Sequence, residues 1–426
     1  MWRMNTEMIV YTITITILAC TTSAFAQEYQ DLNIRVETVA ENLEIPWEIA
    51  FSPDDRIFFT ERTGHLRVIE HGQLQKEPVI KMNVGGSEGG LLGLALDPDF
   101  ENNHYLYLYY TYSEFLSSYN RVSRFVENDN KISNETILID KIPASPIHDG
   151  GRLRFGPDNK LYITTGDSSN GNLAQDLDSL AGKILRINAD GTIPDNNPFQ
   201  GSPVYSYGHR NPQGIDWDPQ TGILVETEHG PSGEKGFAHD EVNIIESGKN
   251  YGWPSVVGEQ TDPKFVSPIY QTGLITWAPS GASFYNSGRI PFFEDKFLVA
   301  TLRGTHLHIF DIDTEQKKII SDESLFSDQF GRLREVVEHD GYVYILTSNR
   351  DGRGSPAVND DRILKITPII NTLLPPLKQI ESGTDAKDIK CNDEYVLLHK
   401  KTDSSPACVK PSTVEKLIQR GWANKI

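Results

Sequence analysis

The feature that most constrains the fold is a strand–turn–strand unit that recurs six times between residues 35 and 367. In each unit, aromatic and aliphatic residues alternate with polar ones over two short runs, which is typical of paired β-strands. No amphipathic helical run of useful length interrupts the series. The units cover residues 56–70, 104–129, 160–188, 222–245, 296–312 and 341–366.

Six units of this spacing predict an all-β fold, a six-bladed β-propeller of four-stranded sheets whose edges are protected by radial closure. Residues 32–40 (LNIRVETVA) would supply the strand that closes the last blade. The alternative is a pair of β-sandwiches, but six equivalent units divide awkwardly between two sandwiches. We expect the propeller domain to span residues 27–367.

In five of the units the first strand ends in polar residues at the same point of the pattern. If the units are blades, these ends lie on one face near the central axis, where propellers and other loop-rich scaffolds place their ligand sites. The ends are residues 60–62, 165–167, 228–230, 302–304 and 348–350.

The first 26 residues are typical of an export signal. Arg3 precedes an apolar run over residues 8–20, and residues 24–26 (AFA) form a small-x-small cleavage site. The run is shorter than the roughly 20 residues that a membrane-spanning helix needs. A lipid anchor at Cys20 is the alternative, although residues 17–19 match a lipobox poorly. We therefore expect an exported protein without a membrane span.

The formal charge of −19 argues against nucleic acid and against an anionic membrane surface as the main partner. After the signal only Cys391 and Cys408 remain, so the propeller has no thiol for catalysis, and two lone sulfurs make a zinc site unlikely to form. In an oxidising compartment they predict a disulfide.

The chain beyond the propeller changes composition. Residues 368–390 are punctuated by proline and predict a linker. Residues 391–426 predict a small tail module, a hairpin tied by Cys391 and Cys408 followed by a short helix from Pro411, with Ser412 or Thr413 as its cap. Attachment, partner docking and stabilisation all remain open as its role.

Several glycine-rich turns between the predicted strands each carry polar or charged side chains. The turns hold EGGLLG (88–93), HDGGRL (148–153), YGHRNPQG (207–214), EHGP (228–231) and GRLREV (331–336), with TTGD, DEVN and GKNYGWP between them. In this order and with these spacings, the motifs resemble the soluble sugar dehydrogenases that depend on pyrroloquinoline quinone (PQQ). The resemblance covers about residues 35–367 and is closer to the aldose sugar dehydrogenase branch of the glucose/sorbosone dehydrogenase family.

The resemblance implies a six-bladed propeller that holds PQQ over its central channel, with a calcium ion between quinone and protein. It implies oxidation of the anomeric carbon of an aldose to a lactone, with electrons passing on to an external acceptor. His148 matches the general base that takes the hydroxyl proton, a role suited to neutral imidazole near its ordinary pKa. Asp167 is expected to orient a neighbouring group or a water.

The remaining site residues also follow from the resemblance. Arg210, Asn211, Arg303, Arg332 and Arg334 match quinone-binding positions, and arginine suits the carboxylates of the quinone. Arg303 stands where glucose-oxidising relatives carry lysine. We expected Arg332 and Arg334, two residues apart, to point to opposite faces of a strand, so that one of them faces away from the site.

Gly230 and Pro231 match the carbonyl ligands of the quinone-bound calcium, while Glu241 and the Tyr251 carbonyl match ligands of a second, structural calcium. Glu88 matches a position that touches sugar or quinone, where glucose-type relatives have glutamine. Ile147 precedes the histidine where those relatives carry an acid, so the identity of the sugar does not carry over.

Two other functions were weighed. A calcium-stabilised propeller could bind a carbohydrate or a protein without turnover, but such a module needs neither His148 nor the arginine set. A calcium-dependent hydrolase of the lactonase type needs metal-bound water among several acids, which a cationic channel disfavours. Because propellers host many activities, the fold alone does not decide between these functions.

Overall fold

The computed structural model describes residues 26–231, 238–258, 260–369, 375–381, 383–392 and 395–424. The chain divides into two compact units after Thr367, and each is described by itself. The predicted export signal and Cys20 lie outside the described residues. None of the helices in the described ranges combines the length and the apolarity needed to cross a bilayer.

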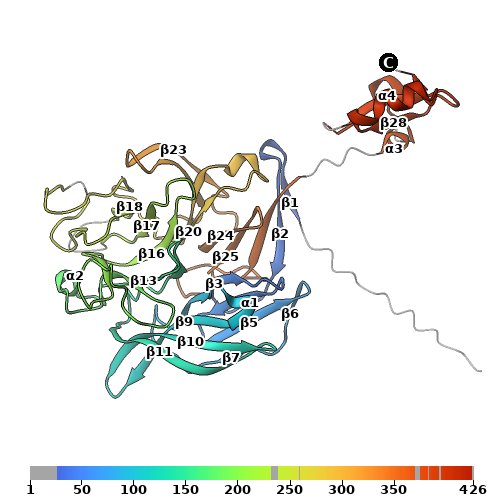
Figure 1. Ribbon diagram of the computed structural model, residues 1–426. Helices are drawn as coiled ribbons and strands as arrows, with labels where there is room; N and C mark the ends of the chain where they lie inside the picture. Colours follow the sequence, from blue (N-terminus) through green and yellow to red (C-terminus); the bar gives the residue numbers. More distant parts are fainter. Residues whose placement is uncertain are drawn as a thin grey trace, which may run out of the picture. The chain divides into compact units, whose positions relative to one another are not determined.

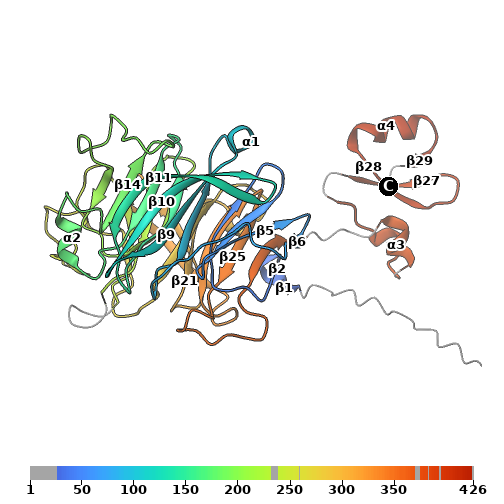
Figure 2. The same ribbon diagram turned by 90° about the horizontal axis from the view of Figure 1, so that it is seen from below.

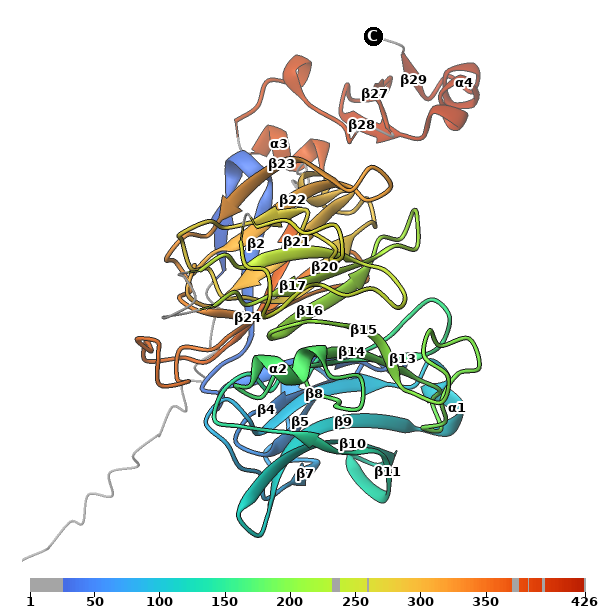
Figure 3. The same ribbon diagram turned by 90° about the vertical axis from the view of Figure 1, so that its left-hand side faces the viewer.

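The first unit is a six-bladed propeller, which confirms the prediction (Figures 1 and 3). Its first three sheets, in chain order, are β3 (Pro46–Phe51), β4 (Ile57–Glu61), β5 (His65–Glu70) and β6 (Gln73–Leu74), with β7 (Ile80–Lys81) beside β5; β8 (Leu91–Leu96), β9 (Tyr105–Glu114), β10 (Ser117–Asn128) and β11 (Lys131–Pro143); and β12 (Leu153–Phe155), β13 (Leu161–Thr165), β14 (Lys183–Ile187) and β15 (Val204–Tyr207). Figure 2 shows β9, β10 and β11 lying side by side.

The other three blades follow the same antiparallel order. They are β16 (Pro212–Trp217), β17 (Leu224–Glu228), β18 (Glu241–Ile245) and β19 (Tyr270–Gln271); β20 (Pro279–Tyr285), β21 (Lys296–Thr301), β22 (Leu307–Asp313) and β23 (Lys318–Leu325); and β24 (Leu333–His339), β25 (Tyr342–Thr347) and β26 (Ile363–Pro368), which β2 (Ile34–Ala40) and β1 (Gln27–Tyr29) extend. The short helices of this unit are η1 (Gln30–Leu32), α1 (Phe100–Asn103), α2 (Gly171–Gln175) and η2 (Pro291–Phe293).

The repeated sequence unit corresponds to the second and third strands of each blade. The pairs β4–β5, β9–β10, β13–β14, β17–β18, β21–β22 and β25–β26 contain the predicted strands. The predicted closing strand, β2, pairs with β26 of the last blade, as expected. The innermost strand β24 also contacts β3 of the first blade, so the ring is closed.

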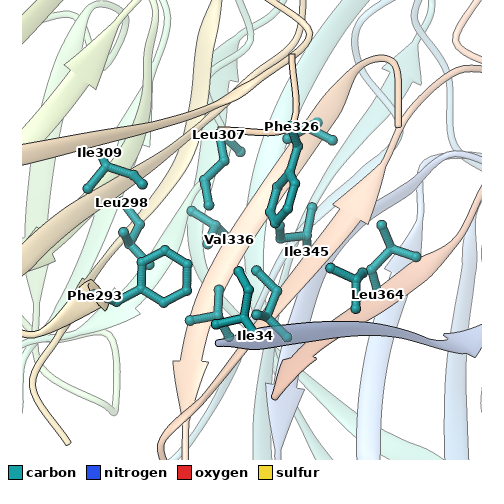
Figure 4. Close-up of a cluster of buried hydrophobic side chains, with 14 of the residues drawn as sticks. Ile34, Phe293, Leu298, Leu307, Ile309, Phe326, Val336, Ile345 and Leu364 are labelled. Atoms are coloured by element: carbon teal, nitrogen blue, oxygen red, sulfur yellow. The ribbon is translucent and has the colours of Figure 1, made fainter. Parts of the chain in front are cut away.

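Apolar side chains fill the space between neighbouring blades. Where the fifth and sixth blades meet, Leu298 and Leu307 pack against Val336 and Ile345, and Ile34 from the closing strand joins them (Figure 4). All five are at most 1% exposed. Because burial of each such side chain contributes roughly 1.5–3 kcal/mol, the closing strand is held by packing as well as by backbone hydrogen bonds.

The central channel is plugged by a buried ion cluster from four blades. Arg152, just before β12, donates to Glu48 of β3, to Glu335 of β24 and, at 2.8 Å, to the carbonyl of Gln213 in β16. None of the three charged side chains is more than 2% exposed. Gly281 of β20 completes the fit, because a Cβ there would lie 2.1 Å from the Glu335 carboxylate.

The second unit holds β27 (Val396–Lys400), β28 (Pro406–Val409) and β29 (Ala423–Asn424) in one sheet, with α3 (Pro376–Glu381), η3 (Ala386–Asp388) and α4 (Pro411–Gln419). The predicted hairpin and the Cys391–Cys408 disulfide are present. The predicted cap of α4 is wrong: the N-cap is Lys410, without a side-chain bond. The segment expected to be a linker carries α3. The side-chain amide of Gln379 in α3 makes two hydrogen bonds to the backbone of Lys390: its Nε2 donates to the carbonyl, and its Oε1 accepts from the N–H.

Replacing Cys391 and Cys408 with serine is expected to destabilise the second unit by about 3 kcal/mol. The disulfide closes a loop with a sequence separation of 17, and a loop of this size restricts the unfolded chain by about that free energy. Limited proteolysis should show faster cleavage within residues 368–426, while the melting temperature of the propeller stays unchanged. Equal protection of that unit in the double variant would contradict this expectation.

Candidate active site

Four of the five predicted strand ends meet on one face of the propeller, whereas residues 165–167 line neither of the hollows found there. Arg62, His229, Leu302, Arg303 and Asn349 each follow one of these strands. All of them line a cleft of about 1030 Å³ or a chamber of about 40 Å³ next to it. The fold thus gathers polar residues from four blades at one place.

The structure brings most of the predicted site residues into this place. The cleft is lined by Glu88, His148, Arg210, Gly230, Arg303 and Arg332, and the chamber by Glu88, Asn211 and Arg334. The two hollows share Glu88, His229, Leu302 and Arg353 in their linings, so these four residues form the boundary between them.

His148 is held at both its backbone and its ring. Its φ of 66° is unusual for a non-glycine residue, and the turn is built with Gly150 and Gly151 at positive φ. Its Nδ1 lies 2.7 Å from Oδ1 of Asp167, whose side chain is 2% exposed. Gly166, between the strand and Asp167, must be glycine because a Cβ would lie 2.0 Å from the His148 carbonyl oxygen.

Asp167 fixes the tautomer of this imidazole. Its Oδ1 also accepts from the Ser169 N–H at 2.8 Å, and its Oδ2 accepts from Nε1 of Trp253 at 2.8 Å. A carboxylate accepts hydrogen bonds and has none to donate, so Nδ1 carries the proton and donates it in a hydrogen bond to Asp167, which leaves Nε2 as the proton acceptor. Since the His148 side chain is 13% exposed and lines the cleft, Nε2 is available to a bound ligand.

Glu88 contacts the backbone of His148 and not its ring. Its Oε2 accepts from the His148 N–H at 2.9 Å and its Oε1 from Nη1 of Arg353 at 2.6 Å. Burial alone would raise the pKa of Glu88, but these two hydrogen bonds outweigh it and lower the pKa. The carboxylate is therefore ionised, and the partner of the imidazole is Asp167.

Both Arg332 and Arg334 face the site, so the expectation that one faces away was wrong. Residues two apart on a strand share a face, and the prediction used this period incorrectly. Arg332 donates from Nε and Nη2 to Oδ2 of Asp351 at 2.9 and 2.8 Å. Arg334 reaches Oε1 of Gln213 at 3.2 Å, and its buried Nε has no partner.

Buried arginines, among them Arg210, Arg332 and Arg334, gather on one side of these hollows and form what we call the cationic wall. Burial lowers the pKa of Arg334, and the nearby guanidinium groups of Arg62 and Arg332 lower it further. Burial likewise lowers the pKa of Arg210, which donates to the carbonyl of His229 at 3.0 Å. Arginine keeps its charge even so, and an anion that entered the site would relieve this repulsion.

Asn211 and His229 lie together in the lining of the chamber. Oδ1 of Asn211 accepts from the Gly150 N–H at 3.1 Å, which ties it to the turn that carries His148. Its Nδ2 lies 3.4 Å from Nδ1 of His229. Burial lowers the pKa of His229 to about 3, so this imidazole is neutral, and its buried Nε2 has no partner.

The four predicted calcium ligands lie round one small cavity. Gly230, Pro231, Glu241 and Tyr251 line a space of about 20 Å³, together with Glu228. Burial, together with the charge of Glu228, raises the pKa of Glu241 to about 8. Two buried oxygens beside this cluster, Oε1 of Glu226 and Oδ1 of Asn243, have no partner. Carboxylate and carbonyl oxygens are the ligands that a hard divalent cation prefers, although Arg210 also lines this cavity.

Asp149 is a buried acid in the wall of the chamber. Its Oδ1 accepts from Nδ2 of Asn120 at 3.0 Å, and its Oδ2 has no partner. Burial raises its pKa to about 7, helped by the charge of Glu88 and opposed by the Asn120 hydrogen bond. The unfolded chain titrates near its ordinary value of about 4, so the folded state binds this proton more tightly.

Asp149→Asn is expected to raise the melting temperature of the propeller at pH 8 by several degrees and to raise it much less at pH 5. The stability that the bound proton contributes is complete below about pH 4 and is lost as the pH rises through about 7. The amide cannot ionise and avoids a loss of up to roughly 4 kcal/mol. Melting curves of both proteins across pH 5–8 measure the difference, and a constant difference would contradict the assignment.

Two charged residues of the site, Asp351 and Arg353, were not predicted, and His229 was named only as part of the strand end 228–230, without a role. His229 stands in the EHGP motif, and the other two stand in the polar, glycine-rich stretch NRDGRG (349–354). Both motifs follow a predicted strand at the point where the other site residues appear. The position of a polar residue after a strand was therefore a usable signal for all three.

Comparison with known proteins agrees with this geometry. Residues 43–364 match the sequence model of the glucose/sorbosone dehydrogenase family. The chain is 31% identical over 366 residues to the aldose sugar dehydrogenase YliI of Escherichia coli, covering 79% of this chain and 93% of that one. It is 34% identical over 285 residues to quinoprotein glucose dehydrogenase B of Acinetobacter calcoaceticus, covering 59% and 58%.

Solved structures give the same result. A glucose dehydrogenase-like oxidoreductase from Thermus thermophilus superposes with a TM-score of 0.72 at 43% identity, over 78% of this chain and 99% of that one. The PQQ-bound aldose sugar dehydrogenase of Streptomyces coelicolor superposes with a TM-score of 0.70 at 33% identity, over 78% and 98%. The chain therefore belongs to the glucose/sorbosone dehydrogenase family.

Proposed function

We propose that the protein is a PQQ-dependent sugar dehydrogenase that oxidises the anomeric carbon of aldoses to lactones. The observation that carries the proposal is the His148–Asp167 pair, which presents a neutral imidazole nitrogen to a cleft walled by arginines. A relative named as a quinoprotein and a solved relative bound to PQQ support the choice of cofactor.

His148 is the general base in this proposal. With Nδ1 directed to Asp167, Nε2 accepts the proton of the anomeric hydroxyl, and Asp167 stabilises the imidazolium that results. Glu88 keeps the histidine turn in place, and its remaining lone pairs are available to a sugar hydroxyl. PQQ, when bound, supplies the acceptor for the hydride of the same carbon.

The cationic wall fits the quinone. Arg210, Arg303, Arg332, Arg334 and Asn211 would hold its carboxylates and carbonyls, and the unpartnered Nε of Arg334 is a donor that awaits an acceptor. Calcium is held in this proposal by the carbonyls of Gly230 and Pro231, and a second calcium by Glu241 and the Tyr251 carbonyl. The unpartnered oxygens of Glu226 and Asn243 support a cation in this region.

The proposal extends to the rest of the chain. Residues 27–367 carry the activity and residues 1–26 direct export. Residues 391–426 form a separate module that follows the segment 368–390 along the chain. In this proposal an external electron acceptor reoxidises the quinone.

The purified protein, reconstituted with PQQ and calcium, is expected to reduce a redox dye in the presence of an aldose. A panel of hexoses, pentoses and disaccharides identifies the sugar, and the visible spectrum of bound quinone reports loading. Chelation followed by readdition of calcium tests the metal. Quinone loading without turnover on any sugar would favour a binding propeller, and neither loading nor turnover would refute the proposal.

A further inference from the structure

Arg353 joins two parts of the propeller that are far apart in sequence. It lies in the loop between β25 and β26, and its Nη1 donates to Oε1 of Glu88, 265 residues away, at 2.6 Å. Both residues line the cleft and the chamber, so their ion pair forms part of the boundary between the two hollows.

Glu88 in turn contacts the backbone of the turn that carries His148. Oε2 of Glu88 accepts from the His148 N–H, and the Glu88 N–H donates to the Pro146 carbonyl at 3.0 Å. The left-handed backbone of His148, at φ 66°, is unfavourable for a residue with a Cβ and persists only where its surroundings fix it. Glu88 supplies one of these restraints, and its own position depends on Arg353.

Asp351 connects Arg353 to the cationic wall. Its Oδ1 accepts from the Arg353 N–H at 2.9 Å, and its Oδ2 accepts from both Nε and Nη2 of Arg332. The contacts therefore run without a break from Arg332 through Asp351, Arg353 and Glu88 to His148. These contacts end at the backbone of His148, and its ring is held from another direction, through Nδ1 and Asp167.

We propose that Arg353 is a positioning residue for His148, acting through Glu88 to set the place of the imidazole in the cleft. The inference rests on the proposed function, because the imidazole needs a fixed place only if it takes a proton from a bound sugar. Through Asp351, the same contacts fix the distance between the histidine turn and Arg332.

The Arg353–Glu88 ion pair acts by fixing the position of Glu88 rather than by the free energy that it adds to folding. The Arg353 side chain is 55% exposed, and ion pairs of such exposure add little to stability. A displacement of a catalytic group by about 1 Å can lower a rate about 100-fold, however. Arg353 also opposes the effect of burial on Glu88, so its loss raises the pKa of that carboxyl.

Arg353→Gln and Arg353→Lys test the proposal, with Lys317→Gln as the matched control. Lys317 pairs with Glu246 at 2.7 Å, its side chain is 49% exposed, and neither residue lines the cleft. Arg353→Gln is expected to lower kcat about 10- to 100-fold while the KM of the sugar and the Kd of PQQ stay within about threefold. The acid limb of the pH–rate profile should move to higher pH, because the loss of Arg353 raises the pKa of Glu88.

Arg353→Lys keeps the charge and should recover most of the lost kcat, which a merely structural defect would not allow. A second readout needs no cofactor: side-chain ¹⁵N signals of His148, assigned by their loss in His148→Gln, should shift in Arg353→Gln and not in Lys317→Gln.

Two results would overturn the proposal. One is an Arg353→Gln protein whose kcat, pH profile and His148 signals match those of Lys317→Gln. The other is a PQQ Kd raised more than tenfold with an unchanged kcat at saturating PQQ, which would make Arg353 a quinone-binding cation. If the wild-type protein does not turn over any sugar, the proposed function fails, and the His148 signals alone decide whether Arg353 positions the ring.

Discussion

His148→Gln is expected to lower kcat for aldose oxidation by roughly 10²- to 10⁴-fold, the range by which general bases contribute to rates. Glutamine can hydrogen-bond in the place of the imidazole but cannot take up a proton near neutral pH. Arg332 and Arg334, the cations proposed to bind the quinone, have their hydrogen bonds to Asp351, Gln213 and Ser280 and not to the ring of His148, so PQQ binding should persist. Dye-coupled kinetics and absorbance titration with PQQ measure the two effects separately.

Asp167→Asn provides the matched comparison. The amide keeps the size of the side chain but, as a weaker acceptor that can also donate, no longer fixes the proton on Nδ1. We expect a smaller kcat than in the wild type and an acid limb at lower pH, since the imidazolium loses its anionic neighbour. If His148→Gln instead abolished PQQ binding, His148 would belong to the cofactor pocket and the base would have to be sought elsewhere.

Arg152→Met is expected to destabilise the propeller by about 3–5 kcal/mol, because it leaves Glu48 and Glu335 buried without their shared cation. Burial already raises the pKa of Glu335 to about 8, although Arg152 lowers it, so the loss of Arg152 would drive Glu335 further towards its protonated form. The methionine keeps much of the packing of the Arg152 stem on Trp47, whose ring lies 4.3 Å from the guanidinium carbon. Denaturant unfolding followed by tryptophan fluorescence gives the loss.

The triple variant Glu48→Gln, Arg152→Met, Glu335→Gln is the control for this prediction. It removes all three charges, so no ion remains buried without a partner, and stability should recover by at least half. A single variant as stable as the wild type would show that water replaces the lost cation in the channel. Equal losses in the single and triple variants would show that the methionine itself disturbs the packing.

The sequence predicted the strands that have a clear period. The second and third strands of each blade have one face against each neighbouring blade and reach polar turns at both ends, so both length and boundaries are visible. The innermost strands were not identified. β12 has only three residues, and β8 (LLGLAL) is buried almost throughout and contains a glycine, so neither shows alternation.

The site was predicted residue by residue but not contact by contact. A single sequence places His148 and Asp167 on consecutive elements, yet only the fold shows that they touch. The contact of Glu88 with Arg353 joins the second and the last blade, which no local pattern encodes. The error on Arg332 and Arg334 had a different origin, since the two-residue period of a strand would have placed them on one face.

The pairing of β2 with β26 sets the order in which the propeller can be completed. β2, near the start of the chain, can pair only after β26, near the end of the propeller, has been made. Closure therefore depends on contacts of very high sequence separation, which form slowly. Until then β26 and β2 are both open edges that can pair with another chain. A chain interrupted before residue 363 would keep its closing strand unpaired, and such fragments are expected to aggregate or to be degraded rather than to persist as five-bladed rings.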